Sequence, residues 1–267
     1  MAVRLKTPEQ IDAIAASGAV VAAVLDDLAS RVRPGATTED LDARAREMIA
    51  AAGGTPSFLG YGGSPGVRRF PAAICASPND LVVHGFPDDR PLVEGDLLSL
   101  DVGVTLDGWV ADAARTVFVG QAGAADRLLV ETADAALDAA IACAVVGGRI
   151  GDIGDAVESR ARAAGLGVFP SLIGHGVGFA LHEDPQIPNV GRRGAGRRMQ
   201  AGLVIAVEPM LTLGGVGLRM ARDGWSVFTA DGARATHTEV TVAITDAGPR
   251  VLTPWGGRWP TQAAAGC

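Results

Sequence analysis

Long apolar runs, a basic surplus and closely spaced cysteines are all missing from this sequence. No uncharged apolar stretch reaches the roughly 20 residues of a membrane-spanning helix, and the N-terminus shows no secretory pattern. Lysine and arginine total 23 against 30 aspartates and glutamates, a net charge of −7 that argues against a nucleic-acid or anionic-membrane surface. Because the three cysteines (Cys75, Cys143 and Cys267) are odd in number and widely spaced, we expect no disulfide framework. These absences predict a cytoplasmic protein.

The chain is long enough for one substantial domain, and its periodicity predicts both helices and strands. Its 267 residues are 48% hydrophobic, which is enough to bury a full core. Near the N-terminus, Thr7 and Gln10 are typical of the two ends of a capping box, with Pro8 in the first turn of the helix that follows. Helical periodicity covers residues 8–30, 38–52, 122–145 and 152–164, with strand-like runs between and after them.

Two segments of the chain look like copies of one another. Residues 35–53 and 147–165 each begin and end at a glycine and enclose an alanine- and arginine-rich helix. An internal repeat of this kind indicates two related α/β halves. Since no Pro/Ser-rich linker separates the halves, we predict a single domain over residues 1–254. Periodicity is lost after Pro254, and residues 255–267 are predicted to form a loosely held tail.

Histidine is scarce, which makes each of the four positions informative. His175 and His182 share a glycine-broken stretch that disfavours a helix, so we expect them to have different roles, one as a metal ligand and one as a hydrogen-bond donor. His84 ends a strand-like run before a turn. For any single histidine a structural role is equally open. A structural role does not explain why three of them lie beside glycines or acid clusters.

Four carboxylates interrupt runs that are otherwise apolar or glycine-rich: Asp101, Asp112, Glu208 and Glu239. A buried acid is costly unless it is paired or binds a metal ion, so each interruption needs a partner. Together with His175 they make a hard-to-borderline ligand set, suited to Mn, Fe, Co or Zn in a paired site. This set is typical of a metal-dependent hydrolase.

The first two carboxylates flank a strong hairpin signal, Asp107-Gly108. With these two residues as the loop, Gly103 lies opposite Asp112, and Asp101 lies on the same face, diagonal to Asp112. Diagonal neighbours are about 7–8 Å apart at Cα, close enough for two carboxylates to converge on one metal pair. Taken alone, the two aspartates are better explained as solvent-facing acids. The four interruptions together favour the metal site.

With these residues identified, the chain resembles a type I methionine aminopeptidase over residues 3–252. The motifs that carry the resemblance are Lys6-Thr-Pro-Glu, Arg33-Pro-Gly, Asn79-Asp-Leu-Val-Val-His-Gly-Phe-Pro-Asp-Asp, Asp96 through Asp101, Gly174-His-Gly-Val-Gly with His182-Glu-Asp-Pro, Glu208-Pro-Met, Asp223-Gly-Trp and the Glu239 strand. The resemblance implies the pita-bread fold, an α/β (α+β) fold with pseudo-twofold symmetry in which helices cover a curved antiparallel sheet. That symmetry agrees with the internal repeat.

The resemblance also implies two divalent metal ions, whether Co, Mn, Fe or Zn. One ion would be held by Asp112, His175, Glu208 and Glu239. The other would be held by Asp101, Asp112 and Glu239, so that Asp112 and Glu239 bridge the pair. The family has these five positions filled, in the same order, by the same residue types.

The implied function is removal of the N-terminal, initiator methionine from nascent proteins and peptides. Metal-assisted hydrolysis would cleave the first peptide bond, with a preference for a small second residue. Glu208 would carry a proton from water to the leaving amine, His182 would stabilise charge on the tetrahedral oxygen, and His84 would contact the substrate amide. The implied enzyme is a cytoplasmic monomer that meets its substrates at the ribosome.

Selectivity for methionine is expected to come from an apolar pocket. The residues of this chain that match the pocket of the family are Phe58, Tyr61, Cys75, Leu181 and Trp225. Leu181 stands where an aromatic residue is common and Ser64 where a tyrosine can occur, so both are expected to widen the pocket. We therefore predict cleavage after Met first, with measurable tolerance of Leu or norleucine. The segment Gly66-Val-Arg-Arg-Phe also looks inserted, and Val240 replaces a frequent histidine without an expected loss of ligation.

His237 lies two residues before Glu239 on a predicted strand, which puts both side chains on one face. Two interpretations stay open. His237 either packs at the edge of the pocket with no metal role, or donates a hydrogen bond to a ligand carboxylate such as that of Asp101. Direct ligation is not expected, because five ligands and water already fill the site.

Two other functions compete with the resemblance. One is an Xaa-Pro aminopeptidase or dipeptidase of the same fold, a class that usually carries a large N-terminal domain for which this chain has no room. The other is a pita-bread binding protein without catalysis, but such proteins typically lose ligands and none is lost here. The complete ligand set favours the aminopeptidase.

Overall fold

The structure is a computed structural model that describes residues 3–259. The helices are α1 (Pro8–Arg31), α2 (Thr38–Ala51), α3 (Ala124–Cys143) and α4 (Ile150–Ala163), with a short 3-10 helix at Trp255–Gly257. The strands are β1 (Thr55–Pro56), β2 (Ile74–Pro78), β3 (Leu81–Val83), β4 (Leu97–Leu106), β5 (Trp109–Phe118), β6 (Gly167–Val168), β7 (Ile173–Gly176), β8 (Glu183–Pro188), β9 (Val204–Val207), β10 (Met210–Thr212), β11 (Leu218–Met220), β12 (Val227–Thr229), β13 (Ala235–His237), β14 (Val240–Thr245) and β15 (Gly248–Val251). The four predicted helices are all present, with ends shifted by a few residues.

The first helix begins as its sequence predicts. The Thr7 hydroxyl accepts a hydrogen bond from the Gln10 amide at 3.3 Å, and the Gln10 side chain accepts one from the Thr7 amide at 3.0 Å. These reciprocal bonds satisfy two amides that the first turn of a helix leaves without partners. The apolar stripe of α1, which includes Ile14, Val21 and Leu25, is fully buried against the sheet.

The β4–β5 hairpin has the predicted register. Leu106 pairs with Trp109 and Gly103 pairs with Asp112. The turn is tight because Asp107 and Gly108 both have positive φ, 50° and 83°, which matches the right-handed twist of the strands. The diagonal placement of Asp101 and Asp112 on one face is therefore confirmed.

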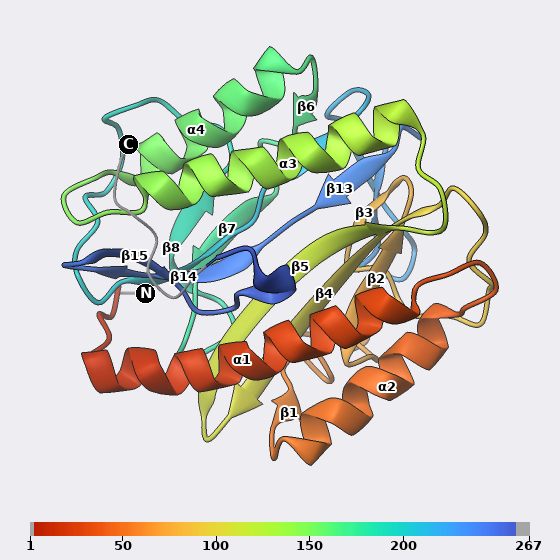
Figure 1. The fold of residues 1–267 in the computed structure, drawn as a ribbon, viewed down its shortest axis with the longest axis horizontal. Helices are drawn as coiled ribbons and strands as arrows, with labels where there is room; N and C mark the ends of the chain where they lie inside the picture. The colour runs from red at the N-terminus through yellow and green to blue at the C-terminus, as the bar shows by residue number, and fades with distance from the viewer. Residues whose placement is uncertain (1–2, 260–267) are drawn as a thin grey trace.

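Helices cover one side of the strands (Figure 1). α1 and α2 lie over the half that contains β1, β2, β4 and β5, and α3 with α4 cover the other half. The second half contains the sheet ordered β15-β14-β9-β7-β8. The halves join where Ala114 of β5 exchanges backbone hydrogen bonds with Glu239, at 3.3 and 2.8 Å. All strand pairs within the described residues are antiparallel, and the two helix pairs agree with the predicted repeat.

The helix α1 packs closely on the chain that follows β15. A Cβ atom at Gly18 would come within 2.0 Å of the Leu252 carbonyl oxygen, so only glycine fits at this point of contact. Trp255 and Trp259 then bury their rings edge to face, 5.0 Å apart. Between them, Arg258 forms ion pairs with Asp134 and Asp138 of α3.

The prediction of a loose tail from residue 255 is therefore wrong for residues 255–259. Burial of two indole rings and pairing of a guanidinium with α3 hold this segment, and a search for periodicity does not detect such contacts. Residues 260–267 of the predicted tail lie outside the described residues. Among the described helices, none combines the length and the apolar character of a membrane span.

The prediction about disulfide bonds also needs a correction. Cys75 is buried and free. Cys143, the last residue of α3, is disulfide-bonded. The expectation of no disulfide framework therefore does not account for Cys143, because spacing along the chain does not show which thiols meet in space.

Candidate metal centre and apolar pocket

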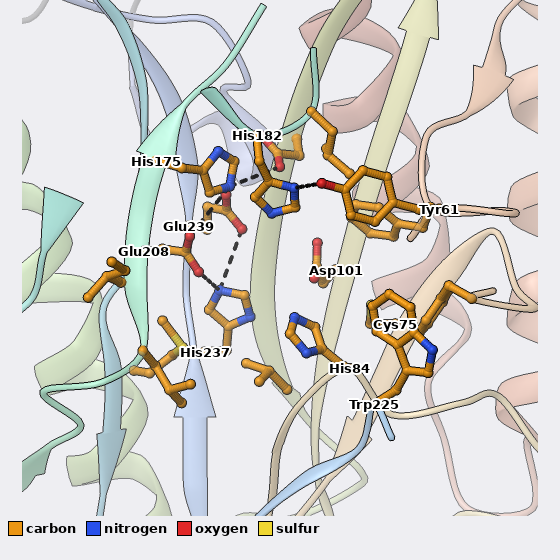
Figure 2. Close-up of a pocket in the computed structure, with 18 of the residues that line it drawn as sticks. Tyr61, Cys75, His84, Asp101, His175, His182, Glu208, Trp225, His237 and Glu239 are labelled. Atoms are coloured by element: carbon orange, nitrogen blue, oxygen red, sulfur yellow. Dashed lines mark hydrogen bonds and ion pairs between the residues drawn. The ribbon is translucent and has the colours of Figure 1, made fainter. Parts of the chain in front are cut away.

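A cavity of about 430 Å³ opens between the two halves, with acids, His175 and His237 on one side and His84 with apolar rings on the other (Figure 2). The residues that line it are Phe58, Tyr61, Phe70, Cys75, Val83, His84, Asp101, Asp112, Ser171, Leu172, Ile173, His175, Leu181, His182, Glu208, Met210, Trp225, His237 and Glu239. All thirteen residues named above as ligands, catalytic groups, pocket residues or their neighbour His237 are in this set. Ser64 is not.

The two aspartates come from the long central hairpin. Asp101 lies on β4 and Asp112 on β5, and both are buried. The Thr241 hydroxyl of β14 accepts a hydrogen bond from the Asp112 amide at 3.2 Å and donates to the Asp112 carbonyl at 2.8 Å. This contact fixes the backbone that carries Asp112 against the second sheet.

The two glutamates sit at the ends of paired strands. Val207 of β9 pairs with Val240 of β14, so Glu208 and Glu239 occupy the next position of the same antiparallel ladder. Glu208 is anchored through its carbonyl oxygen, which accepts a hydrogen bond from the Asn189 side chain at 2.8 Å. Val240 is fully buried in the core, away from the cavity, as expected for the residue after Glu239.

His175, on β7, faces this carboxylate group through one ring nitrogen. Its Nδ1 lies 2.9 Å from the Gly176 carbonyl oxygen and must donate to it, because a carbonyl only accepts. Nε2 is then the nitrogen with the free lone pair, and it lies 3.6 Å from Asp112 Oδ2 and 3.5 Å from Glu208 Oε1. The fixed tautomer suits a metal ligand.

His237 approaches the same carboxylates from β13. Its Nε2 lies 3.4 Å from Glu208 Oε2 and 3.5 Å from Glu239 Oε2, and the ring is buried (Figure 2). His237 and Glu239 therefore point to the same side. The hydrogen bond to Asp101 that the sequence suggested is not among the contacts of His237, whose nearest carboxylates are those of Glu208 and Glu239.

The burial of so many acids changes their protonation. Burial, with the neighbouring carboxylates, raises the pKa of Asp101 to about 7 and that of Asp112 to about 6. For the same reasons the pKa of Glu239 is well above its usual value. Although burial opposes it, the contacts with Glu208 and Glu239 hold the pKa of His237 well above its usual value. Without a bound cation, the raised pKa values of these carboxyl groups and of His237 mean that protons neutralise part of the negative charge of the cluster.

The residues present fit a divalent metal ion. Within the described residues, Asp101 Oδ1, Glu239 Oε1 and His237 Nε2 are buried without a hydrogen-bond partner. Potential ligand atoms of Asp101, His237 and Glu239 lie within 4.8 Å of one another, and so do those of Asp112, His175 and Glu239. Buried acceptors without donors, next to imidazole nitrogens, are the arrangement that a cation would complete.

His182 stands at the mouth of the cavity beside His175, with ring centroids 4.2 Å apart. Its Nδ1 is 2.6 Å from the hydroxyl of Tyr61. Withdrawal of the ring from water, together with the neighbouring His175, lowers the pKa of His182 to about 4. The imidazole is therefore neutral at pH 7 and carries one proton, on one of its two nitrogens.

His84 lies on the opposite wall, directly after β3. It has a φ of 60°, which residues other than glycine rarely adopt. The Ser77 hydroxyl accepts a hydrogen bond from the following amide, of Gly85, at 3.2 Å and so helps to hold the turn. Burial lowers the pKa of His84. The turn directs a neutral imidazole toward the cavity, 6.1 Å from the ring centre of Trp225.

The apolar wall contains a ring that the sequence did not identify. Phe70 packs edge to face on Trp225, with ring centroids 5.4 Å apart, and lines the cavity. Phe70 belongs to the segment Gly66-Val-Arg-Arg-Phe that looked inserted, and the chain turns back there at the Ser64–Val67 backbone pair. The Arg68 carbonyl oxygen of this segment accepts a hydrogen bond from the Trp225 indole nitrogen at 2.7 Å. Ser64 is exposed in that turn and does not line the cavity, so the prediction that it widens the pocket relative to a tyrosine at this position stays a prediction.

Other lining residues were also missed, among them Ile173 and Met210. The sequence could have indicated them, because Ile173 lies two residues before His175 and Met210 two residues after Glu208, each on a short strand. Leu181 is buried and lines the cavity as expected.

Comparison with known proteins gives consistent results over nearly the whole chain. Residues 12–246 match metallopeptidase family M24. The chain is 48% identical to "Methionine aminopeptidase 1" of Mycobacterium tuberculosis (strain CDC 1551 / Oshkosh) over 251 residues, which is 91% of this chain and 92% of that protein. The solved methionine aminopeptidase of Thermotoga maritima superposes with a TM-score of 0.90 at 36% identity, covering 94% of this chain and 99% of that one.

A prolidase of the same fold is a more distant neighbour. The prolidase of Pyrococcus furiosus superposes with a TM-score of 0.75 at 21% identity, covering 93% of this chain and 65% of the prolidase. Identity this low shows a common fold and nothing about activity.

Proposed function

This chain belongs to metallopeptidase family M24 and, within it, to the type I methionine aminopeptidases, and from that membership we propose that it removes the N-terminal methionine of proteins and peptides, with a preference for a small second residue. The observation that carries the proposal is a cavity in which a buried carboxylate–imidazole cluster faces a wall of apolar rings. Groups suited to hydrolysis and groups suited to binding an apolar side chain thus line the same cavity.

The cluster is proposed to hold two divalent ions, of Co, Mn, Fe or Zn. Asp112, His175, Glu208 and Glu239 would hold one, and Asp101, Asp112 and Glu239 the other. When bound, such ions acidify water and polarise a carbonyl group. The orphaned oxygens of Asp101 and Glu239 and the free lone pair of His175 support this proposal.

Glu208 is the group to which we assign proton transfer. Its two carboxylate oxygens face different imidazoles, Oε1 that of His175 and Oε2 that of His237. Despite burial, His237 and His175 keep the pKa of Glu208 below its usual value, so the carboxylate is ionised and able to accept a proton. We assign to it the proton that water loses and that the leaving amine gains.

His182 and Tyr61 act together at the substrate carbonyl. Burial raises the pKa of Tyr61, so its hydroxyl remains protonated and can donate to Nδ1 of His182. That hydrogen bond leaves the single imidazole proton on Nε2, where it can be donated to the oxygen that gains charge during hydrolysis. Tyr61 is thus assigned a positioning role in addition to its place in the pocket wall.

Recognition of the substrate is assigned to the remaining walls. Phe58, Phe70, Leu181 and Trp225 would enclose the methionine side chain, with Cys75 at the base, and thioether sulfur packs favourably on aromatic rings. His84 would contact the substrate amide. The acidic cluster would attract a free α-amine, which an internal residue of a protein does not have.

The remaining assignments concern the setting of the enzyme. We propose a single catalytic domain, with residues 255–259 packed as part of it, that acts as a monomer on nascent chains at the ribosome, in the cytoplasm. The prolidase of Pyrococcus furiosus is only 21% identical to this chain, whereas the methionine aminopeptidases of Mycobacterium tuberculosis and Bacillus subtilis are 48% and 37% identical to it over 91% and 93% of its length.

The test compares three peptides with metal-loaded protein: Met-Ala-Ser, its N-acetylated form and Ala-Pro-Phe. Release of methionine from the first peptide alone is the expected result. Cleavage of Ala-Pro-Phe in preference would assign the chain to the Xaa-Pro peptidases. Equal cleavage of the acetylated peptide would show that the free amine is not recognised.

A further inference from the structure

We propose that His237 is itself a metal ligand, so that the cluster has an imidazole on each side of Glu208. This inference rests on the proposed function, because it concerns the same pair of ions. It also differs from both sequence-based interpretations, in which His237 either packs at the edge of the pocket or donates a hydrogen bond to a ligand carboxylate.

The distances around His237 repeat those around His175. His175 Nε2 lies 3.6 and 3.5 Å from oxygens of Asp112 and Glu208. His237 Nε2 lies 3.4 and 3.5 Å from oxygens of Glu208 and Glu239. These separations are long for an N–H···O hydrogen bond, whose usual range is about 2.7–3.2 Å. Two atoms that bind one tetrahedral ion at about 2.0–2.2 Å are roughly 3.3–3.6 Å apart, which matches both histidines.

The Nε2 atom of His237 lies at ion-pair distance from Glu208 and Glu239 but makes no hydrogen bond to them. It is buried and has no hydrogen-bond partner among the described residues. Buried polar nitrogens almost always have a hydrogen-bond partner, so one that lies 3.4 and 3.5 Å from two carboxylates without a hydrogen bond to either needs a further partner. A cation between Nε2 and the carboxylates supplies that partner.

The backbone holds His237 in this position from both sides. Its amide donates to the hydroxyls of Ser99 at 3.2 Å and Thr116 at 3.1 Å, on the two strands of the central hairpin. Its carbonyl accepts a hydrogen bond from the Thr116 hydroxyl at 2.9 Å. On the other edge, His237 pairs with Met210 of β10. A ligand on a strand fixed in this way is pre-positioned for binding.

With His237 included, the two halves of the cluster become chemically alike. One group is Asp112, His175 and Glu239, and the other is Asp101, His237 and Glu239. Each combines one imidazole with two carboxylates. An imidazole in the second group favours Fe, Co or Zn over Mg or Ca, because Mg and Ca prefer ligand sets made only of oxygen atoms.

The test uses metal-depleted protein titrated with Co(II) alone. Wild type is compared with His237→Ala and His237→Gln, and with His84→Ala as a control histidine that lines the same cavity but belongs to neither ligand group. Calorimetry measures the affinity of each binding step. Proton NMR of the Co(II)-loaded protein counts the exchangeable imidazole N–H signals shifted by the paramagnetic ion.

Wild type and His84→Ala are expected to show two such signals and both binding steps. His237→Ala should lose one signal, and its weaker binding step should fall by more than the 10- to 100-fold typical when a ligand only loses its hydrogen-bond partner, that is by more than about 100-fold. His237→Gln should behave like the alanine variant, because an amide can replace a hydrogen-bond donor but not an imidazole ligand. Circular dichroism of the metal-free variants checks that they are folded.

Two results overturn the proposal. One is a single shifted imidazole signal in wild type, which needs no variant to interpret. The other is near-wild-type Co(II) affinity in His237→Gln, which would mean that His237 acts as a hydrogen-bond donor. Methionine release by wild type is measured separately, so loss of this inference leaves the proposed function standing, and the reverse also holds.

Discussion

Replacing Tyr61 with phenylalanine tests whether one hydroxyl sets the proton position of His182. The substitution removes the 2.6 Å contact with His182 Nδ1 and keeps the ring that packs 5.1 Å from the imidazole. The pocket wall is therefore unchanged, and only the hydrogen bond is lost.

The size of the effect follows from that bond. A hydrogen bond between neutral groups contributes about 0.5–1.5 kcal/mol, which is about 2- to 12-fold in rate. Tyr61 is 37% exposed, so water can partly replace the lost contact and the lower half of that range applies. We expect kcat to fall about 2- to 5-fold for Met-Ala-Ser, with KM nearly constant.

The assay is steady-state release of methionine by Tyr61→Phe, His182→Ala and the double variant, each loaded with the same metal. His182→Ala should lose about 10²- to 10³-fold, as when one donor to a developing oxyanion is removed. Since Tyr61 acts through His182, the double variant should be no worse than His182→Ala. Additive losses, or a rise in KM alone in Tyr61→Phe, would refute the positioning role and leave Tyr61 a pocket residue.

Three further outcomes follow from the site. Asp101→Asn should abolish turnover while the protein stays folded, because it removes a charge from the group that has Asp101 and Glu239 as carboxylates; activity within a few-fold of wild type would contradict the two-ion assignment. Phe70→Leu should lower kcat/KM for Met-Ala-Ser by about fivefold, or 1 kcal/mol, and narrow the preference for Met over Leu, as measured with paired peptides. Without metal, burial raises the pKa of Asp101 to about 7 and of Asp112 to about 6. The folded state therefore binds more protons than the unfolded state between pH 4 and 7, and the free energy of unfolding falls as the pH rises through that window. Metal-free protein should therefore melt at a lower temperature at pH 8 than at pH 6, an effect that Asp101→Asn should reduce.

The parts of the fold that local chemistry determines could be predicted from the sequence. Asp107-Gly108 defines its own turn type, and the turn then sets the register that places Asp101 diagonal to Asp112. The capping box at Thr7 is equally local. Glu208 and Glu239 were recognised because an acid in a buried strand requires an explanation, even though 31 positions separate them.

The parts that depend on contacts distant in sequence could not be predicted in this way. Phe70 reaches the pocket because Trp225 binds the Arg68 carbonyl, and no sequence period encodes that contact. Trp255 and Trp259 follow a stretch without regular pattern and are held by each other and by α3 through Arg258. His237 was placed on the correct face by the two-residue period of a strand, but its carboxylate neighbours depend on how β9, β13 and β14 meet.

The central claim is that the buried cluster uses two divalent ions to release an N-terminal methionine, and metal add-back measures it most directly. Wild-type protein is depleted with chelator, titrated with Co(II) or Mn(II), and assayed on Met-Ala-Ser with bound metal counted at each step. Activity should be absent without metal and reach its maximum as the second equivalent binds to the part of the cluster that contains Asp101 and Glu239. Full methionine release by the metal-free protein, or a maximum that no bound metal accompanies, would contradict the account.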